Sequence, residues 1–240
     1  MLKIGQIGIG HNHSDKIKSI QRHPELFQLV GYAEENEEWV ARRGERPHFI
    51  DVPRMSVDEI IEKSDAILVE TDVWDLTKTA QKCIDAGKHI HMDKPASGTL
   101  EEFKHLLDTA KEKNLVVQLG YMYRYNPEII KLMESIKNGE LGEIISVEAQ
   151  MNCFHPVGKR QWLDHFPGGM MFFLGCHLID LIMQIMGEPK NVVPYNRTTG
   201  KDGITSCDLG MAVLEYKNGV SFAKASAAEL GGFERRQLVV

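Results

Sequence analysis

The sequence predicts an α/β fold, with a doubly wound parallel sheet in its first half and a smaller α+β domain with a largely antiparallel, incomplete sheet in its second half. Strand-like and helix-like patterns alternate as far as residue 121, which is typical of right-handed βαβ units. A Gly-x-Gly turn follows the first strand, and the alternation stops after Tyr121. We therefore expect one domain over residues 1–121 and a second over residues 122–240.

The first domain is predicted to contain six strands separated by helices. Each strand pattern is a short apolar run, and Gly44 and Gly87 stand where helices end. The expected strands cover residues 3–9, 27–33, 48–50, 65–71, 88–92 and 115–121, and the expected helices cover residues 14–22, 35–44, 56–63, 76–87 and 99–114.

The second domain begins with a helix at residues 127–139 and a long strand at 143–154. A strongly apolar helix at residues 170–187 precedes strand patterns at 191–198, 207–219, 221–229 and 235–240. Asn218-Gly219 lies between two apolar runs, which is typical of a β-hairpin. Consecutive strands after helices indicate an antiparallel sheet.

The composition excludes several classes of function. The net charge of −6, without a basic cluster, argues against a nucleic-acid partner, and no apolar run approaches the length of a membrane span. Scattered cysteines and the lack of a signal peptide favour the cytoplasm. Cys153, His155, His165 and Cys176 fit no standard metal-ligand spacing, so no metal site is expected.

The glycine turn at Gly8 and Gly10 is the first candidate site. Gly8 permits a tight turn, and Gly10 allows the backbone to approach a pyrophosphate. The alternative is that the glycines only make a turn. His13 stands in place of a third glycine, and His11 and His13 either contact phosphate or are exposed loop residues without a specific role.

Glu34, at the end of the second strand, is the second candidate. A carboxylate there accepts hydrogen bonds from ribose hydroxyls and repels a 2′-phosphate, which favours NAD over NADP. The alternative is an acid that stabilises the N-terminus of the next helix.

Lys94 and His177 form the third candidate. Lys94 lies beyond the carboxyl end of the fifth strand, where doubly wound sheets bind ligands. His177 lies on the apolar helix, three residues before Asp180. The pair is explained most simply as a core histidine satisfied by an aspartate, but a histidine that faces a nicotinamide would be a general base.

Together, "IGQIGIG", "AGKHIHMDKP", "GYMYRYNP" and "PGGMMFFLGCHLIDLIMQIMG" resemble the Gfo/Idh/MocA oxidoreductases, the glucose–fructose oxidoreductase and inositol dehydrogenase superfamily. The resemblance covers essentially the whole chain. It implies a Rossmann domain with NAD as cofactor and a sugar, inositol or related polyol as substrate. It also implies catalytic roles for Lys94 and His177, and it matches Arg124 to an arginine at the domain junction.

Position along the chain completes the set of candidate site residues, since Trp162, Asp164 and His165 lie just before the glycines at 168 and 169. Trp162 and Asp164 are expected to line the substrate pocket beside Arg124 and His177, and Asp180 is expected to orient His177. The expected cofactor-binding residues are Gly8, Gly10, His11, Asn12, Glu34, Thr71 and Lys94.

Two departures from the family pattern leave alternatives open. Phe173 replaces an aspartate four residues before His177, and the family's second domain extends about a hundred residues beyond Val240, so we expect a truncated domain. The leading hypothesis is an NAD-dependent dehydrogenase that forms homodimers or homotetramers. The alternatives are an NAD(H)-binding sensor or degenerate paralogue without turnover, and an NAD-assisted glycosidase.

Overall fold

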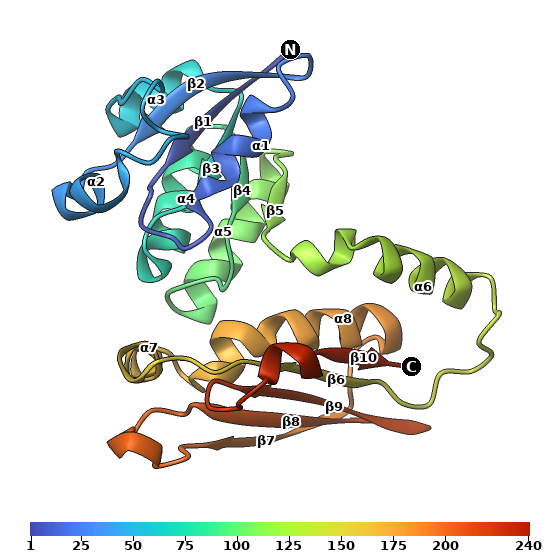
Figure 1. Ribbon diagram of the computed structural model, residues 1–240. Helices are drawn as coiled ribbons and strands as arrows, with labels where there is room; N and C mark the ends of the chain where they lie inside the picture. The colour runs from blue at the N-terminus through green and yellow to red at the C-terminus, as the bar shows by residue number, and fades with distance from the viewer. The chain divides into compact units, whose positions relative to one another are not determined.

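The computed structural model describes all 240 residues and divides them into two compact units, Met1–Gly120 and Tyr121–Val240 (Figure 1). The boundary lies one residue before the one that the sequence predicts.

The first unit contains a five-stranded parallel sheet with the order β2-β1-β3-β4-β5. The order reverses between β1 and β3, which makes this edge of the sheet a topological switch point. The strands are β1 (Leu2–Ile7), β2 (Phe27–Ala33), β3 (Ala66–Val69), β4 (His89–Met92) and β5 (Val117–Leu119). The predicted fold class is confirmed.

Short helices connect these strands. They are α1 (Ile17–Gln21), which follows a 3₁₀ turn at Ser14–Lys16, α2 (Glu37–Arg43), α3 (Val57–Lys63), α4 (Leu76–Asp85) and α5 (Leu100–Glu112). Helices α3 and α5 begin at capping boxes, in which Ser56 and Thr99 pair with Glu59 and Glu102. Such reciprocal hydrogen bonds satisfy the free amides of a first helical turn.

The prediction of a strand at residues 48–50 is wrong. Phe49 lies in a turn between α2 and α3, where its ring packs 5.0 Å from the ring of Tyr32 in a cluster with Ile9 and Ile17. Of the apolar residues that suggested a strand, Phe49 is therefore the buried side of a loop, whereas Ile50 is exposed.

The second unit contains a mixed sheet with the order β10-β6-β9-β8-β7. Only the β6–β9 pair is parallel. The strands are β6 (Glu148–Asn152), β7 (Asn191–Arg197), β8 (Leu209–Tyr216), β9 (Gly219–Ser226) and β10 (Gln237–Val239). Strand β7 is an edge strand, the position in which a sheet tolerates Pro194, and β8 and β9 form the predicted hairpin.

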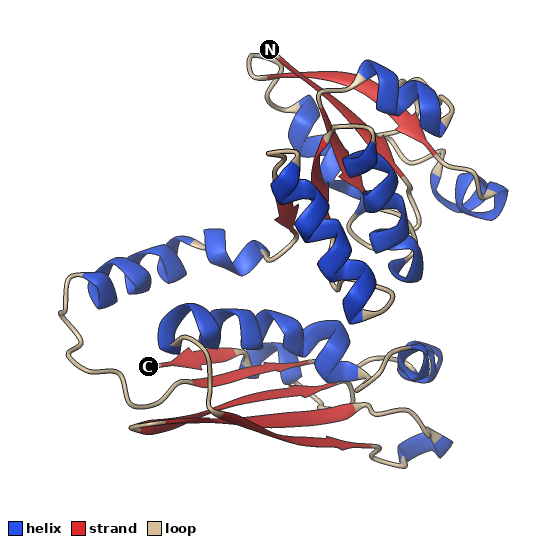
Figure 2. Cartoon of the chain, turned by 180° about the vertical axis from the view of Figure 1, so that it is seen from behind, coloured by secondary structure: helices blue, strands red, loops and turns tan.

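The helices of the second unit are α6 (Pro127–Lys137), α7 (Val157–Trp162) and α8 (Cys176–Met186). Helix α8 lies along one face of the sheet (Figure 2), with Leu178 and Ile182 packed in a core with Ala149 and Leu214. The helix predicted at residues 170–187 is present from Met170 to Met186, but Met171–Gly175 form a π-helical turn within it before α8. None of the helices is long and apolar enough to cross a membrane.

Candidate functional site

The glycine turn after β1 touches the ends of two neighbouring strands. The amide of Gly8 donates to the Ala33 carbonyl over 2.8 Å, at the end of β2. Gly8 has a φ of +91°, and a Cβ at this position would fall on the backbone of Thr71, just beyond β3. Only glycine adopts this conformation without strain and leaves room for Thr71.

Gly10 lies beneath the first turns of α2. A Cβ on Gly10 would come within 2.9 Å of Trp39 Nε1, which donates to Asp72 Oδ2 over 2.6 Å. The Arg43 guanidinium lies 4.6 Å from the centroid of the Trp39 ring and donates to the Ile9 carbonyl over 2.9 Å. Helix α2 therefore packs against the turn, and the close approach of Trp39 requires that residue 10 carry no side chain.

Glu34 follows β2 and binds the same turn. Its carboxylate accepts hydrogen bonds from the amide of Ile9 over 2.8 Å and from the amide of Asn36 over 2.9 Å. The acid predicted to bind ribose is thus held at the carboxyl end of the sheet by two backbone donors.

These residues line a cavity of about 230 Å³ at the ends of β1, β2 and β3. Its lining includes Gly8, Glu34, Asn36, Thr71, Asp72 and Lys78. A cavity at the switch point of a parallel sheet, with a side-chain-free turn and a fixed carboxylate, fits the adenosine end of a dinucleotide. Of the predicted cofactor residues, the structure brings Gly8, Glu34 and Thr71 together here.

His11 and Asn12, the next residues of the turn, differ in their exposure to solvent. Asn12 is exposed, and its Oδ1 lies 3.4 Å from Arg43 Nη2. His11 is only 2% exposed, so the expectation of an exposed loop histidine is wrong. Because its ring packs toward the ends of β3 and β4, its side chain is available to acids there and not to solvent.

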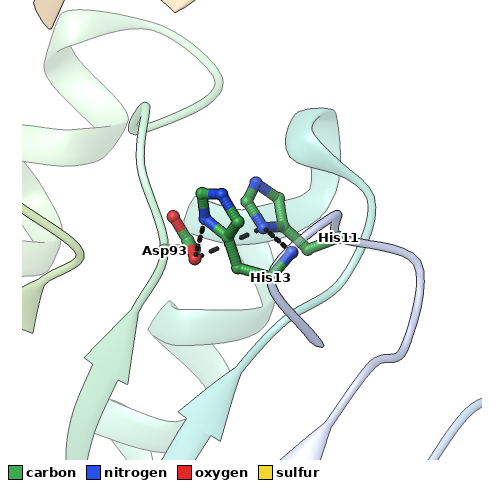
Figure 3. A group of neighbouring side chains, drawn as sticks. All are labelled: His11, His13 and Asp93. Atoms are coloured by element: carbon green, nitrogen blue, oxygen red, sulfur yellow. Dashed lines mark hydrogen bonds and ion pairs between the residues drawn. The ribbon is translucent and has the colours of Figure 1, made fainter. Parts of the chain in front are cut away.

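His11 belongs to a charged cluster that sequence reasoning missed (Figure 3). His11 Nδ1 lies 3.3 Å from Asp93 Oδ2 and 3.5 Å from Glu70 Oε2, and His13 Nδ1 lies 3.0 Å from Asp93 Oδ2. Lys16 forms ion pairs with both acids. Glu70 and Asp93 each follow a buried strand, and acids at the ends of adjacent parallel strands were the signal that could have revealed the cluster.

Burial and mutual charge shift the pKa values in this cluster. Burial raises the pKa of Asp93, but hydrogen bonds from His11 and His13 and the charge of Lys16 outweigh it, and the net pKa is lowered. Burial raises the pKa of Glu70. The pKa of His11 is lowered by burial but raised more by Asp93 and Glu70, so it lies above its ordinary value.

Lys94 follows Asp93 directly, and the two form one backbone unit. The amide of Lys94 donates to Asp93 Oδ1 over 2.6 Å, and the Lys94–Pro95 peptide is cis. Lys94 is 2% exposed. Asp93 therefore has a structural role, because its Oδ1 accepts a hydrogen bond from the amide of Lys94 while its Oδ2 contacts His11 and His13.

In the second unit, Arg124 binds Asp180. Arg124 Nε donates to Asp180 Oδ2 over 2.8 Å, and Nη2 donates to the other carboxylate oxygen. Both oxygens of Asp180 are thus engaged by a guanidinium, as is common for bidentate pairs. Its predicted role as the group that orients His177 stays a prediction.

His177 lies in the first turn of α8 and is 3% exposed. Its ring contacts the rings of Tyr123 and Tyr121 edge to face, with centroids 5.0 and 5.8 Å apart. The rings of Tyr121 and of Tyr123, which lies in the 3₁₀ turn at Met122–Tyr125, therefore pack against the imidazole.

Phe173 lies in an aromatic cluster and is 8% exposed. Its ring lies 5.0 Å from that of Trp162 and 5.9 Å from that of Phe166. Lys159 Nζ lies 3.3 Å from the centroid of the Trp162 ring and 4.6 Å from that of Phe173. Trp162 thus packs against neighbours within its own unit, and Asp164 is exposed in the following 3₁₀ turn.

Comparison with known proteins identifies the family. Residues 2–121 match the oxidoreductase family with an NAD-binding Rossmann fold, and residues 129–234 match the GFO/IDH/MocA C-terminal domain. The chain belongs to the GFO/IDH/MocA family. The resemblance stated from the sequence motifs is confirmed.

Individual relatives place the chain among proteins named as oxidoreductases. It is 30% identical to the Escherichia coli protein "Uncharacterized oxidoreductase YhhX", over 71% of this chain and 49% of the relative. It is 28% identical to the Bacillus subtilis "scyllo-inositol 2-dehydrogenase (NADP(+)) IolW", over 56% of this chain and 38% of the relative. The chain spans about a third to a half of the length of these curated relatives.

A solved structure shows the same fold. The WlbA dehydrogenase from Bordetella pertussis, solved with NADH and UDP-GlcNAcA, matches with a TM-score of 0.81. The two proteins are 18% identical, and the match covers 96% of this chain and 68% of the other.

Proposed function

We propose that the first unit binds NAD(H) in the cavity at the ends of β1, β2 and β3. The observation that carries this proposal is the hydrogen bond between the Glu34 carboxylate and the amide of Ile9, inside the Gly8–Gly10 turn. Backbone free of side chains suits a pyrophosphate, and a fixed carboxylate suits the ribose hydroxyls. Thr71 and Asp72 complete the lining.

The same carboxylate supports NAD over NADP. A 2′-phosphate beside Glu34 would meet a like charge, and Glu35 and Asp72 line the same cavity. The relatives do not decide the question, because IolW is named with NADP(+) and WlbA was solved with NADH. The preference therefore rests on this chain's own acids.

We propose further that the chain belongs to an oxidoreductase that acts on a secondary alcohol of a sugar, inositol or related polyol. The bound nicotinamide would supply the hydride acceptor. His177 would accept the hydroxyl proton, and Lys94 would donate a hydrogen bond to the same oxygen. Arg124, Trp162 and Asp164 are proposed substrate contacts. The names of relatives such as IolW support this substrate class.

A paired fluorescence titration with NADH and NADPH tests the cofactor proposal without knowledge of the substrate. We expect saturable binding of NADH and at least tenfold weaker binding of NADPH. Binding of neither nucleotide would overturn the proposal, and equal binding of both would remove the role of Glu34. A screen of inositols and sugars for NADH formation then tests the reaction.

A second function, NAD(H) binding without turnover, is favoured by Phe173. The structure places this phenyl ring in a packed aromatic cluster at the position where the family carries an aspartate. This alternative predicts NADH binding without oxidation of any polyol tested. Turnover by the unmodified chain would exclude it. The cytoplasmic location and the homo-oligomer remain predictions from the sequence.

A further inference from the structure

The cluster beneath the glycine turn has the composition of a metal site. Two imidazoles, from His11 and His13, meet the carboxylate of Asp93 (Figure 3), and the carboxylate of Glu70 lies beside the ring of His11, 3.5 Å from its Nδ1. The four side chains come from three separate segments that the parallel sheet brings to one edge. None of these four residues lines the cavity that contains Glu34, although His11 is also among the predicted cofactor-binding residues and Asp93 directly precedes Lys94.

The distances between the donor atoms suit a single ion. His13 Nδ1 to Asp93 Oδ2 is 3.0 Å, His11 Nδ1 to Asp93 Oδ2 is 3.3 Å, and His11 Nδ1 to Glu70 Oε2 is 3.5 Å. Ligands at about 2.0–2.2 Å from an ion in tetrahedral or octahedral geometry stand roughly 3.0–3.5 Å apart. The donor atoms of His11, His13 and Asp93 all lie within 4.8 Å of one another, so a modest closing movement of the side chains would let them bind one ion.

The cluster also holds polar atoms that its own hydrogen bonds do not satisfy. His11 Nε2 is buried without a hydrogen-bond partner, on the side of the ring away from Nδ1, and Glu70 Oε2 has no partner besides the 3.5 Å ion pair with His11 Nδ1, in residues that are 2% and 0% exposed. His11 Nδ1 faces the amide of His13 at 3.2 Å as well as the two carboxylates. A nitrogen with either one proton or one lone pair cannot satisfy all three neighbours, and such buried groups call for a partner.

Lys16 supplies the positive charge that the two carboxylates require. Its ammonium lies 3.0 Å from Glu70 Oε1 and also binds Asp93 Oδ2. The side chain of Lys16 is 27% exposed, in contrast to the fully buried acids. A flexible lysine at the margin can withdraw its charge to solvent, so another cation can compete for the same oxygens.

The donor set selects the kind of ion. Imidazole nitrogen with carboxylate oxygen suits zinc, cobalt, iron or manganese, whereas calcium and magnesium prefer oxygen alone. We propose that His11, His13 and Asp93 bind a divalent first-row transition ion, with the Glu70 carboxylate beside the site and Lys16 as the competing cation.

Titration of the chelator-treated chain with Co²⁺ alone tests this proposal, since the visible spectrum of cobalt reports nitrogen and oxygen ligands directly. We expect one Co²⁺ per chain, displaced by Zn²⁺ and not by Mg²⁺. His13→Ala should weaken binding at least tenfold. The side chain of His13 is 42% exposed, so its loss should not prevent folding. His105→Ala, an exposed histidine on α5, is the matched control and should leave binding unchanged.

Lys16→Met separates the competing role of the lysine from the ligands. It removes the rival charge and should tighten Co²⁺ binding several-fold. The absence of a saturable cobalt spectrum in the unmodified chain, or equal affinity in His13→Ala, would overturn the site. Unchanged affinity in Lys16→Met would overturn the competition. None of these readouts depends on NAD(H) or turnover.

Discussion

The carboxylate of Glu34 accepts a hydrogen bond from the amide of Ile9 over 2.8 Å. This bond fastens the acid at the end of β2 to the glycine turn at the end of β1. Its second oxygen accepts from the amide of Asn36. The two strand ends are thus joined by a side chain that also lines the candidate cofactor cavity.

Glu34→Gln should weaken NADH binding about tenfold and narrow the difference between NADH and NADPH. Glutamine lacks the negative charge, and its NH₂ group is a donor where the carboxylate offers a second acceptor. A hydrogen bond to a charged group contributes about 1.5–3 kcal/mol. Nucleotide titration of the variant and the unmodified chain checks this. Glu35→Gln, in the same cavity, is the control and should change affinity less. Equal effects of the two substitutions would show a general charge effect.

Gly8→Ala should destabilise the first unit by about 3 kcal/mol or more. Its φ of +91° strains any side chain, and the new Cβ would press on the backbone of Thr71. Gly87 is the matched control, with a φ of +76° and no atom within 4 Å of the position that an alanine Cβ would take. Gly87→Ala should therefore cost only about 1 kcal/mol. Denaturant unfolding of both variants measures the difference, and similar losses would contradict the close contact.

The sequence was sufficient to predict the doubly wound sheet, because that fold depends on local signals, and the candidate residues Gly8 and Glu34 lie at its edge, where their roles stay predictions. Alternating strand and helix patterns indicate βαβ units, and Gly8, Gly10 and Glu34 stand at fixed positions within the first of them. The run at residues 48–50 misled, since a turn that buries Phe49 and exposes Ile50 has the same short apolar pattern as a strand.

The charged cluster was harder to predict from the sequence, because its members are distant from one another along the chain and only the acids at the ends of two strands point to it. His11 and Asp93 are more than eighty positions apart, and only the order of β1, β3 and β4 brings them together. The partner of Asp180 was missed for a related reason. Spacing along α8 pointed to His177, whereas Arg124 reaches the same carboxylate from another segment.

Phe173→Asp should destabilise the second unit less than Phe166→Asp, although both phenyl rings are 8% exposed. Lys159 Nζ lies 4.6 Å from the centroid of the Phe173 ring, so a carboxylate at residue 173 would have a counter-ion within reach. A hydrogen-bonded charge is stabilised by about 1.5–3 kcal/mol relative to an unpaired one. Thermal or denaturant unfolding of the two variants checks the order, and the reverse order would exclude pairing with Lys159.

His91→Gln should reduce the loss of stability that follows acidification. Burial, followed by the charge of Lys16, lowers the pKa of His91 from 6.5 to about 4. Below pH 6.5 the His91 imidazole is therefore protonated in the unfolded chain, whereas in the folded chain it becomes protonated only near pH 4. This group's contribution to stability is present above pH 6.5 and is lost as the pH falls, by about 2 kcal/mol between pH 7 and pH 5.

Glutamine at residue 91 has no proton to gain and can still hydrogen-bond Gln118, the present partner of His91 Nδ1. Urea unfolding at pH 7 and pH 5 measures the effect as the difference between the variant and the unmodified chain. The raised pKa of His11 acts in the opposite direction but is common to both proteins, so it cancels. His105→Gln, on an exposed face of α5, should keep the full acid sensitivity. An equal loss in His91→Gln would show that the sensitivity originates elsewhere.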